Sequence, residues 1–336
     1  QSPAVSNIGS GFGNTYPVMG IINPVSIIRS SNALKSNDIH TVFISFRGAY
    51  DRGHDKIAVN KLIDLLVKYL EAPEQKDMDK ALSELCVTWA GRDGAEALAN
   101  AFIALQEAGN YKSKTAARIR STYWGLSTRH ITRPLVFAPQ LLAPEEEAYF
   151  LPHVFNVSLK EARMDYTDIH GGNPEPPEPG AMNNYISMLN KAIVLMESIP
   201  ESAPEYEYIM DMAKAWRIYS SFMRSGGNFG EAQVIRNRNS DRLNQPPGRP
   251  DKTPTWDGDA DLQAFNDIMR DELDNTAELI ALLKSGGMKF IYHADNPRYE
   301  DTFLPGPDLI EQLQLKMKIM IDHWTDIEGF LKSPYK

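Results

Sequence analysis

Residues 41–66 read TVFISFRGAYDRGHDKIAVNKLIDLL, and the structural period of the sequence changes within them. The hexapeptide 41–46 is apolar and rich in β-branched and aromatic residues, which indicates a strand. From Ala58 onward the apolar residues recur every three or four positions, which is typical of an amphipathic helix. The sequence therefore predicts a strand, a polar loop and a helix, in that order. The apolar segments 18–22 and 25–28 are further strand candidates.

Helical periodicity continues along most of the chain that follows. Further apolar stripes with this spacing occur in residues 82–89, 97–105, 182–196, 206–223, 259–283 and 309–327. Pro307 and Asp308 are suited to the start of the last helix, and Gly286 and Gly287 to the end of the helix before it. The predicted fold class is therefore mainly α, with a helical domain preceded by a small α/β portion.

Composition narrows the class of protein. The chain has 336 residues, 42% of them hydrophobic and 24% charged, which is ordinary for a globular protein. Its formal net charge of −9 argues against a nucleic-acid partner, because phosphate binding needs a surplus of Lys and Arg. The longest apolar runs, 134–138 and 279–283, are far shorter than the ~20 residues that span a bilayer. Cys86 is the single cysteine, and we expect it to be a buried apolar residue.

The Gly- and Pro-rich residues 170–180 are the best candidate for a linker. They divide the chain into a strand-containing segment 1–56, a first helical region 57–170 and a C-terminal helical region 181–336. Residues 170–180 could equally be a long surface loop packed over a single helical domain. A few strands cannot form an independent sheet, and the chain starts at Gln1 without a Met or a signal peptide. We therefore expect an upstream portion that completes a larger α/β unit.

A first group of candidate site residues follows the predicted strand. Arg47, Asp51, Arg52 and His54 lie within a short polar segment before the helix. In α/β folds the loops at the carboxyl ends of strands hold the ligand, so these side chains could bind a polar or anionic substrate. Alternatively, Asp55 caps the following helix, and Arg47 and Asp51 form a local ion pair.

A second group combines aromatic and cationic side chains between residues 123 and 133. Tyr123 and Trp124 offer flat faces on which sugar rings can stack. Arg129, His130 and Arg133 can donate hydrogen bonds to hydroxyls or carboxylates. Alternatively, Trp124 belongs to the core and the two arginines neutralise nearby helix ends.

Several common chemistries have no signature in this sequence. The seven histidines show no i, i+4 pairing of the kind that binds a metal, so no metal site is predicted. The sequence contains no G-x-S-x-G, P-loop, G-x-G-x-x-G, H-E-x-x-H or C-x-x-C motif. No cofactor is therefore expected.

The order of several segments resembles a known family. The strand and polar loop lead into VNKLIDLL at 59–66 and LCVTWA at 85–90. The pieces YWGL and RPLV then follow between 123 and 136, and GPDL and DHW between 306 and 324. This arrangement resembles the C-terminal part of α-glucuronidase-like bacterial glycoside hydrolases, in which the last strands of a (β/α)8 barrel lead into a helical domain.

The resemblance implies a secreted or periplasmic enzyme that hydrolyses glycosidic bonds in polysaccharide fragments, including fragments that contain uronic acids. Such enzymes need two carboxylates at the scissile bond. The chain has no Glu before Glu71, so the resemblance implies a catalytic acid upstream of Gln1. Asp51 is then the candidate catalytic base or substrate-binding carboxylate, with Arg47, Arg52 and His54 as its neighbours.

A second class of function stays open. The chain could be a non-catalytic, helical carbohydrate-binding or scaffold protein that stacks sugars on Tyr123, Trp124 and Trp256. In both classes the expected ligand is a carbohydrate. The expected protein partner is either an upstream catalytic portion or a second copy of the chain.

Overall fold

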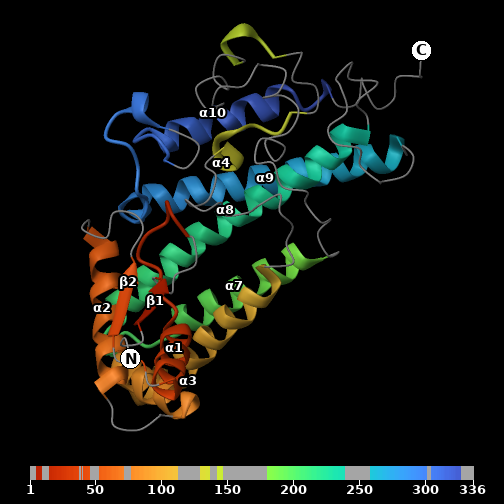
Figure 1. The fold of residues 1–336 in the computed structure, drawn as a ribbon. Helices are drawn as coiled ribbons and strands as arrows, with labels where there is room; N and C mark the ends of the chain where they lie inside the picture. Colours follow the sequence, from red (N-terminus) through yellow and green to blue (C-terminus); the bar gives the residue numbers. More distant parts are fainter. Residues whose placement is uncertain are drawn as a thin grey trace.

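The computed structural model describes residues 5–9, 15–37, 39, 41–45, 53–71, 77–112, 129–136, 142–146, 180–238, 258–300 and 304–326. This part of the chain is mainly helical, as the sequence predicts (Figure 1). Its elements are, in order, β1 (Val5–Gly9), α1 (Pro24–Ser36), β2 (Thr41–Ser45), α2 (Gly53–Glu71), α3 (Met78–Lys112), α4 (Arg129–Thr132), α7 (Ala181–Glu197), α8 (Tyr206–Arg238), α9 (Gly258–Lys284), the 3-10 turns η5 (Gly287–Phe290) and η6 (Pro297–Tyr299), and α10 (Leu309–Asp322).

The two strands form a parallel pair near the start of the chain. Val5 pairs with Thr41 and Gly9 with Ser45, so both strands end at the same edge of the pair. Helix α1 connects them, which makes β1, α1 and β2 one βαβ unit beside α2 (Figure 1). β2 confirms the strand predicted from Thr41, whereas β1 was not predicted.

The strand candidates at 18–22 and 25–28 were wrong. Residues 18–22 form no strand, although Val18 makes an isolated antiparallel bridge to Ile291. Residues 25–28 lie in helix α1, which begins with Pro24 at its first turn. Asn23 caps this helix, because its side-chain oxygen accepts a hydrogen bond of 3.2 Å from the backbone N–H of Val25. The capping residues outweighed the strand preference of the β-branched side chains.

The predicted apolar stripe of α2 is buried in the structure. Ala58, Leu62, Leu65, Leu66 and Tyr69 all face the core. The Tyr69 hydroxyl also donates a hydrogen bond of 3.0 Å to the carbonyl oxygen of Ala81 in α3. The stripe therefore packs α2 mainly against α1, and the Tyr69 hydrogen bond attaches the end of α2 to the start of α3.

A glycine divides the long helix α3 into two pieces. Gly91 has φ 69° and ψ 178°, a conformation that side-chain-bearing residues rarely adopt. The break leaves the carbonyl oxygen of Trp89 without its usual intrahelical donor, and the backbone N–H of Glu205 donates to it at 2.9 Å. The start of α8 is therefore attached to the middle of α3.

One large hydrophobic core joins most of the helices. It contains side chains from α1, α2, α3, α7, α8, α9, η5 and α10, including Phe102 of α3 and Ile193 of α7. Figure 1 shows α7 running beside α3 and α8 beside α9, with α10 across α9. Helices from both sides of residues 170–180 thus share one core, although residues 170–179 lie outside the described part.

Helix α8 continues well beyond the predicted end at Met223. The sequence Ser225-Gly226-Gly227-Asn228 looks like a helix stop, but these residues lie inside α8. The polar side chains of Ser225 and Asn228 donate hydrogen bonds to Glu272 of α9, at 2.7 and 2.8 Å. These bonds satisfy the polar groups inside the bundle, so the helix continues.

The last two helices end and begin as predicted. Gly286, with φ 91°, follows the end of α9 in the left-handed conformation. α10 starts after Pro307 and Asp308. Among the described helices, none has both the length and the apolar character needed to cross a bilayer.

Candidate functional site

A hollow of about 530 Å³ lies between α2, the start of α8 and η5. We call it the α2–α8 hollow, and its polar lining consists of Lys61, Glu201, Glu205, Tyr206, Glu207, Tyr208 and Asp211. Its apolar lining includes Ile57, Met212 and Phe290. The size is within the range of small-molecule sites, and carboxylates, aromatic rings and an ammonium group meet in it. It is therefore the strongest candidate site in the described part of the chain.

Three backbone attachments hold the walls of this hollow together. The N–H of Glu205 donates to the Trp89 carbonyl oxygen at 2.9 Å, which joins α8 to α3. The N–H of Met19 donates to the Phe290 carbonyl oxygen at 2.7 Å, and that of Tyr292 to the Pro17 oxygen at 2.8 Å. The segment that carries Gly20 is thus fixed against η5. Distant parts of the chain are needed to form the hollow.

Lys61 has an ion pair and two aromatic neighbours at this site. Its Nζ lies 3.0 Å from Glu205 Oε2, 4.5 Å from the ring centre of Tyr208 and 5.2 Å from that of Trp89. The two rings meet edge to face, with centroids 5.6 Å apart. The Lys61 and Glu205 side chains are 20% and 40% exposed, so each contact contributes on the order of 0.5–1 kcal/mol. The wall therefore holds an ammonium between a carboxylate and aromatic faces.

Tyr208 contributes a hydroxyl with no hydrogen-bond partner among the described residues. Its Oη atom is buried and makes no hydrogen bond in that part of the chain. Burial, with a smaller contribution from the charge of Glu205, raises the pKa of this phenol well above its usual range. The hydroxyl therefore stays protonated at neutral pH.

The carboxylates of the hollow differ in their partners. Asp211 accepts hydrogen bonds of 2.8 Å from Lys289 at both of its oxygens, and Glu205 pairs with Lys61. Glu201 and Glu207 are exposed, and neither has a cationic partner among the described residues. The lining thus contains four carboxylates and one cationic side chain, Lys61.

A second polar cluster is buried in the helical bundle. Lys316 Nζ pairs with Glu272 and donates to the carbonyl oxygen of Ile131 at 2.7 Å. Burial lowers the pKa of Lys316, while the nearby Glu272 carboxylate opposes the shift. Its hydrogen bonds join α4, α8, α9 and α10, so its geometry fits a structural role.

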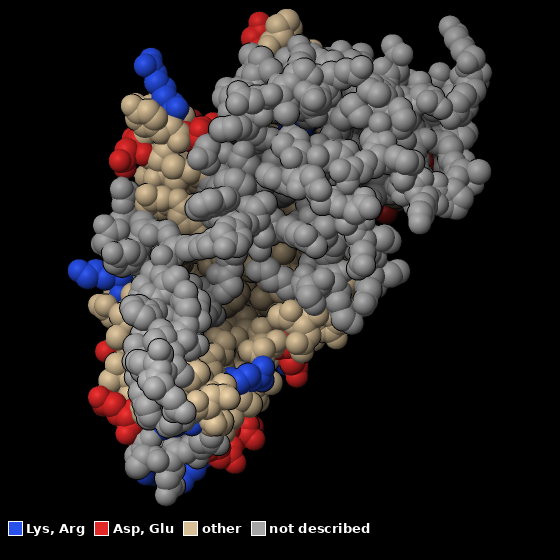
Figure 2. Space-filling model, viewed as in Figure 1, with Lys and Arg blue, Asp and Glu red and all other residues tan. Residues whose placement is uncertain are grey.

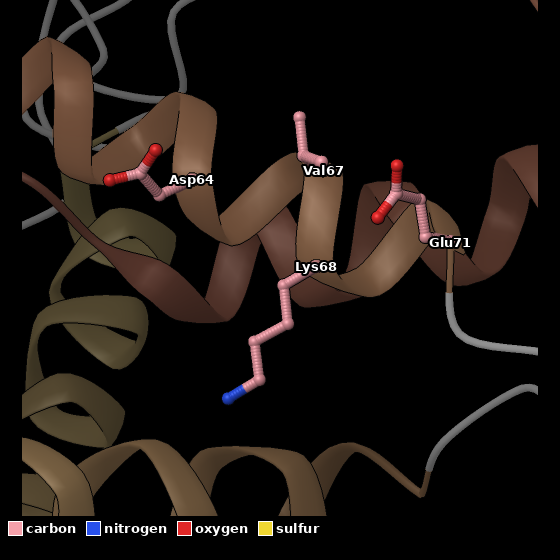
Figure 3. Close-up of a pocket in the computed structure, with 4 residues that line it drawn as sticks. All are labelled: Asp64, Val67, Lys68 and Glu71. Atoms are coloured by element: carbon pink, nitrogen blue, oxygen red, sulfur yellow. The ribbon is translucent and has the colours of Figure 1, made fainter.

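A shallow depression on the outer face of α2 is a weaker candidate. It is lined by Asp64, Val67, Lys68 and Glu71, which all belong to one helix. Figure 3 shows Lys68 pointing away from Val67 and Glu71, so the charged groups do not converge on one position. We find no chemistry that this arrangement favours.

The two predicted groups of site residues lie largely outside the described structure. Arg47, Asp51, Arg52, Tyr123, Trp124 and Trp256 are outside it, and His54, Arg129 and His130 have only their backbones described, in α2 and α4. Arg133 is described and is 8% exposed, with its guanidinium carbon 5.5 Å from the ring centre of Phe229. Arg133 thus lies against the small core cluster of α8, α9 and α10 rather than beside the hollow.

Sequence reasoning missed Lys61, Glu205 and Tyr208. Two local signals were present. Lys61 directly precedes the buried Leu62 in α2, and residues 200–208 read PESAPEYEY, in which acidic and aromatic residues alternate. Neither signal indicates that these two segments meet.

The described Lys and Arg form no large cationic area on the face seen in Figure 2. On the face seen in Figure 2, the described Lys and Arg are scattered, and Asp and Glu occur at several places around the edge. No group of three or more His, Cys, Asp and Glu in the described part could hold a metal ion. The hollow itself is lined by four carboxylates and one lysine, which disfavours the binding of a phosphate backbone there.

Comparison with family models, with curated proteins and with solved structures gave no match. The fold and the hollow define a mainly helical protein with a short parallel βαβ unit and an acidic, aromatic hollow next to α2.

Proposed function

We propose that the chain is part of a carbohydrate-active enzyme that hydrolyses glycosidic bonds in polysaccharide fragments. In this proposal β1, α1 and β2 are the last βαβ unit of a (β/α)8 barrel, and the helices that follow form its attached helical domain. The localisation that goes with it is a secreted or periplasmic one in a bacterium. The observation that carries the proposal is the parallel pairing of β1 with β2.

The parallel pair supports the choice of site residues through its topology. Because Gly9 pairs with Ser45, both strands end at one edge of the pair. The chain continues from Ser45 through Arg47, Asp51 and Arg52 to the start of α2 at Gly53. Ligands of α/β folds bind at the carboxyl ends of parallel strands. We therefore assign Asp51 as a catalytic or substrate-binding carboxylate, with Arg47, Arg52 and His54 as substrate-binding residues.

The α2–α8 hollow supports a carbohydrate ligand independently of the strands. Ile57 lines the hollow four residues after Gly53, which is ~6 Å along the helix axis. The hollow is therefore close to the end of α2 that the 47–52 segment enters. Its carboxylates can accept hydrogen bonds from sugar hydroxyls, and Tyr206 and Tyr208 supply aromatic rings.

The test is hydrolysis by the native protein that contains this chain, with uronic-acid-containing and neutral oligosaccharides as substrates. We expect release of shorter products, and we expect Asp51→Asn to lower kcat/KM at least ~100-fold, as the loss of a catalytic carboxylate does. The matched control is Asp93→Asn, which makes the same change at an exposed position of α3. Equal activity in both variants would contradict the role of Asp51.

A second candidate function is non-catalytic carbohydrate binding, or a scaffold role. The hollow favours it, because a concave surface with tyrosines and carboxylates is sufficient for binding and needs no pair of catalytic groups. Binding of oligosaccharides without turnover, in a titration followed over many hours by product analysis, would support this function over the first.

A further inference from the structure

The ring of His323 lies between two carboxylates at the end of α10. Its Nε2 is 2.9 Å from Oε2 of Glu146, and its Nδ1 is 2.5 Å from Oδ2 of Asp326. A neutral imidazole carries one N–H, and an ionised carboxylate can only accept a hydrogen bond. Both nitrogens are therefore satisfied only when the ring is protonated and donates twice.

The two carboxylates belong to different parts of the chain. Asp326 follows His323 by three residues, whereas Glu146 is 177 residues away from it in the sequence. Glu146 Oε2 also accepts a hydrogen bond of 2.8 Å from the backbone N–H of Ala143, so this carboxylate closes residues 143–146 into a turn. The contact between Glu146 and His323 therefore fastens that turn to the end of α10.

Leu142 attaches the same segment to α10 through an apolar contact. It is 7% exposed and forms a small cluster with Val136 and with Ile319 of α10. The residues at 143–145 are exposed. In the described part of the chain, the attachment of the segment 142–146 thus combines a small apolar cluster with a charged contact.

The surroundings of His323 favour its protonated form. Burial lowers the pKa of the ring, but the hydrogen bonds to Asp326 and Glu146, with the charges of both carboxylates, outweigh burial and raise the pKa. The ring is fully charged below the ordinary imidazole value of ~6.5. It becomes neutral as the pH rises through the raised value.

Two further charged pairs involve α10. Lys318 pairs with Asp322 and acts on Glu146, but the Lys318 side chain is 68% exposed, so solvent weakens its effect. On the side of α9, Lys316 pairs with Glu272, about two helical turns before His323. Asp326 and Glu146 are the charged groups of the described part that act on the ring itself.

We propose that His323 is a pH-sensitive latch that fastens the segment 142–146 to α10 when its ring is protonated and releases Glu146 when the ring is neutral. The neutral ring keeps its proton on Nδ1, because the contact with Asp326 closes a much shorter loop than the contact with Glu146. The bare Nε2 then faces a carboxylate, and two acceptors repel each other. This inference goes beyond the proposed function and does not depend on a carbohydrate ligand.

The experiment is an NMR titration of the native protein from about pH 5 to about pH 9, which spans the ordinary imidazole pKa. It follows the ring nitrogens of His323, the methyl groups of Leu142 and the amide of Ala143. We expect the Leu142 and Ala143 signals to shift with the same midpoint as the ring, and Nε2 to lose its proton while Nδ1 keeps it. The methyl signals of Ile193, in the large core, should stay constant, which separates local release from unfolding.

Glu146→Gln is the test variant. An amide can accept from the charged ring and donate to the neutral ring, so the contact persists in both states. We expect the ring of His323 to titrate in this variant and the Leu142 signals to lose most of their pH-dependent shift. His293→Gln is the matched control, because the His293 ring contacts the backbone carbonyl oxygen of Ala294 at 2.8 Å. It should leave the Leu142 transition unchanged.

Three results would overturn the latch. The first is a set of Leu142 and Ala143 signals that do not follow the titration of His323 in the wild-type protein. The second is a neutral ring with its proton on Nε2, because the contact with Glu146 would then be kept. The third is an undiminished Leu142 shift in Glu146→Gln, which would show that the charge of the ring alone moves these signals.

Discussion

Lys316 of α10 and Glu272 of α9 form an ion pair in which both side chains are 0% exposed. Ser225 and Asn228 of α8 donate to the Glu272 oxygens at 2.7 and 2.8 Å, and the carbonyl oxygen of Ile131 accepts from Lys316 at 2.7 Å. Four segments of the chain thus meet at one pair of charges. Because each charge has hydrogen-bond partners, the pair is tolerated inside the bundle.

Removal of one charge from this pair should destabilise the protein strongly. We expect Lys316→Met to lower the free energy of unfolding by ~3–5 kcal/mol, because the Glu272 carboxylate is left buried without a cation. The double change Lys316→Met with Glu272→Leu should cost much less than the sum of the two single changes. Urea unfolding curves provide the measurement, and additive effects of the two changes would contradict the coupling.

His323 at the end of α10 should make stability depend on pH. Burial lowers the pKa of His323, but hydrogen bonds to Asp326 at 2.5 Å and Glu146 at 2.9 Å, with the charges of both carboxylates, outweigh it and raise the pKa. The folded state therefore binds the proton more tightly than the unfolded state, whose imidazole has a pKa of ~6.5. The contribution to stability is complete below that value and is lost as the pH rises through the raised folded pKa.

The measurement is an NMR titration of the His323 ring together with unfolding at several pH values. Glu146→Gln should lower the pKa of His323 relative to the wild-type protein and should reduce the loss of stability toward high pH. His323→Gln should remove this component of the pH dependence. An unchanged pH dependence in His323→Gln would show that other groups produce it.

Cys86 should not react with thiol reagents in the native protein. The side chain is 0% exposed, and burial raises the pKa of its thiol to about 12. Since the thiolate is the reactive form, alkylation at pH 8 should be negligible until the protein unfolds. The rate of modification by iodoacetamide, with and without urea, provides the measurement. Rapid labelling without denaturant would show that α3 opens locally.

Lys61 should stabilise the contact between α2 and the start of α8. Lys61→Met removes the ion pair with Glu205 and the contacts with the Trp89 and Tyr208 rings, so we expect the free energy of unfolding to fall by ~0.5–1 kcal/mol. Lys68→Met is the matched control, because Lys68 also lies on α2 and over a tyrosine ring, at 5.8 Å from the centre of Tyr69. Urea unfolding curves provide the measurement, and equal stability of the two variants would show that the Glu205 ion pair contributes nothing.

The sequence predicts the parts of this fold that depend on local pattern. β2 and α2 follow from a change of period, and the end of α9 follows from Gly286. The sequence failed where a distant residue decides: Ser225 and Asn228 look like a helix stop until Glu272 accepts their hydrogen bonds. Lys61 meets Glu205 only because α8 is attached to α3, and no local pattern encodes that contact.

Gly91 fixes that attachment, so its replacement should affect both stability and the hollow. Gly91→Ala forces a side chain onto φ 69° and ψ 178°, which should cost ~1–3 kcal/mol. If α3 instead straightens, the Trp89 carbonyl oxygen returns to its own helix and the Glu205 N–H loses its acceptor.

Gly109→Ala is the matched control, because no described atom lies within 4 Å of the added Cβ, and alanine favours a helix. It should be neutral or stabilise by up to ~1 kcal/mol. Unfolding curves measure the cost. The NMR chemical shifts of the Tyr208 ring show whether the lining of the α2–α8 hollow has changed. We expect these shifts to change in Gly91→Ala and to remain the same in Gly109→Ala. Unchanged shifts in both variants would show that Gly91 does not position the hollow.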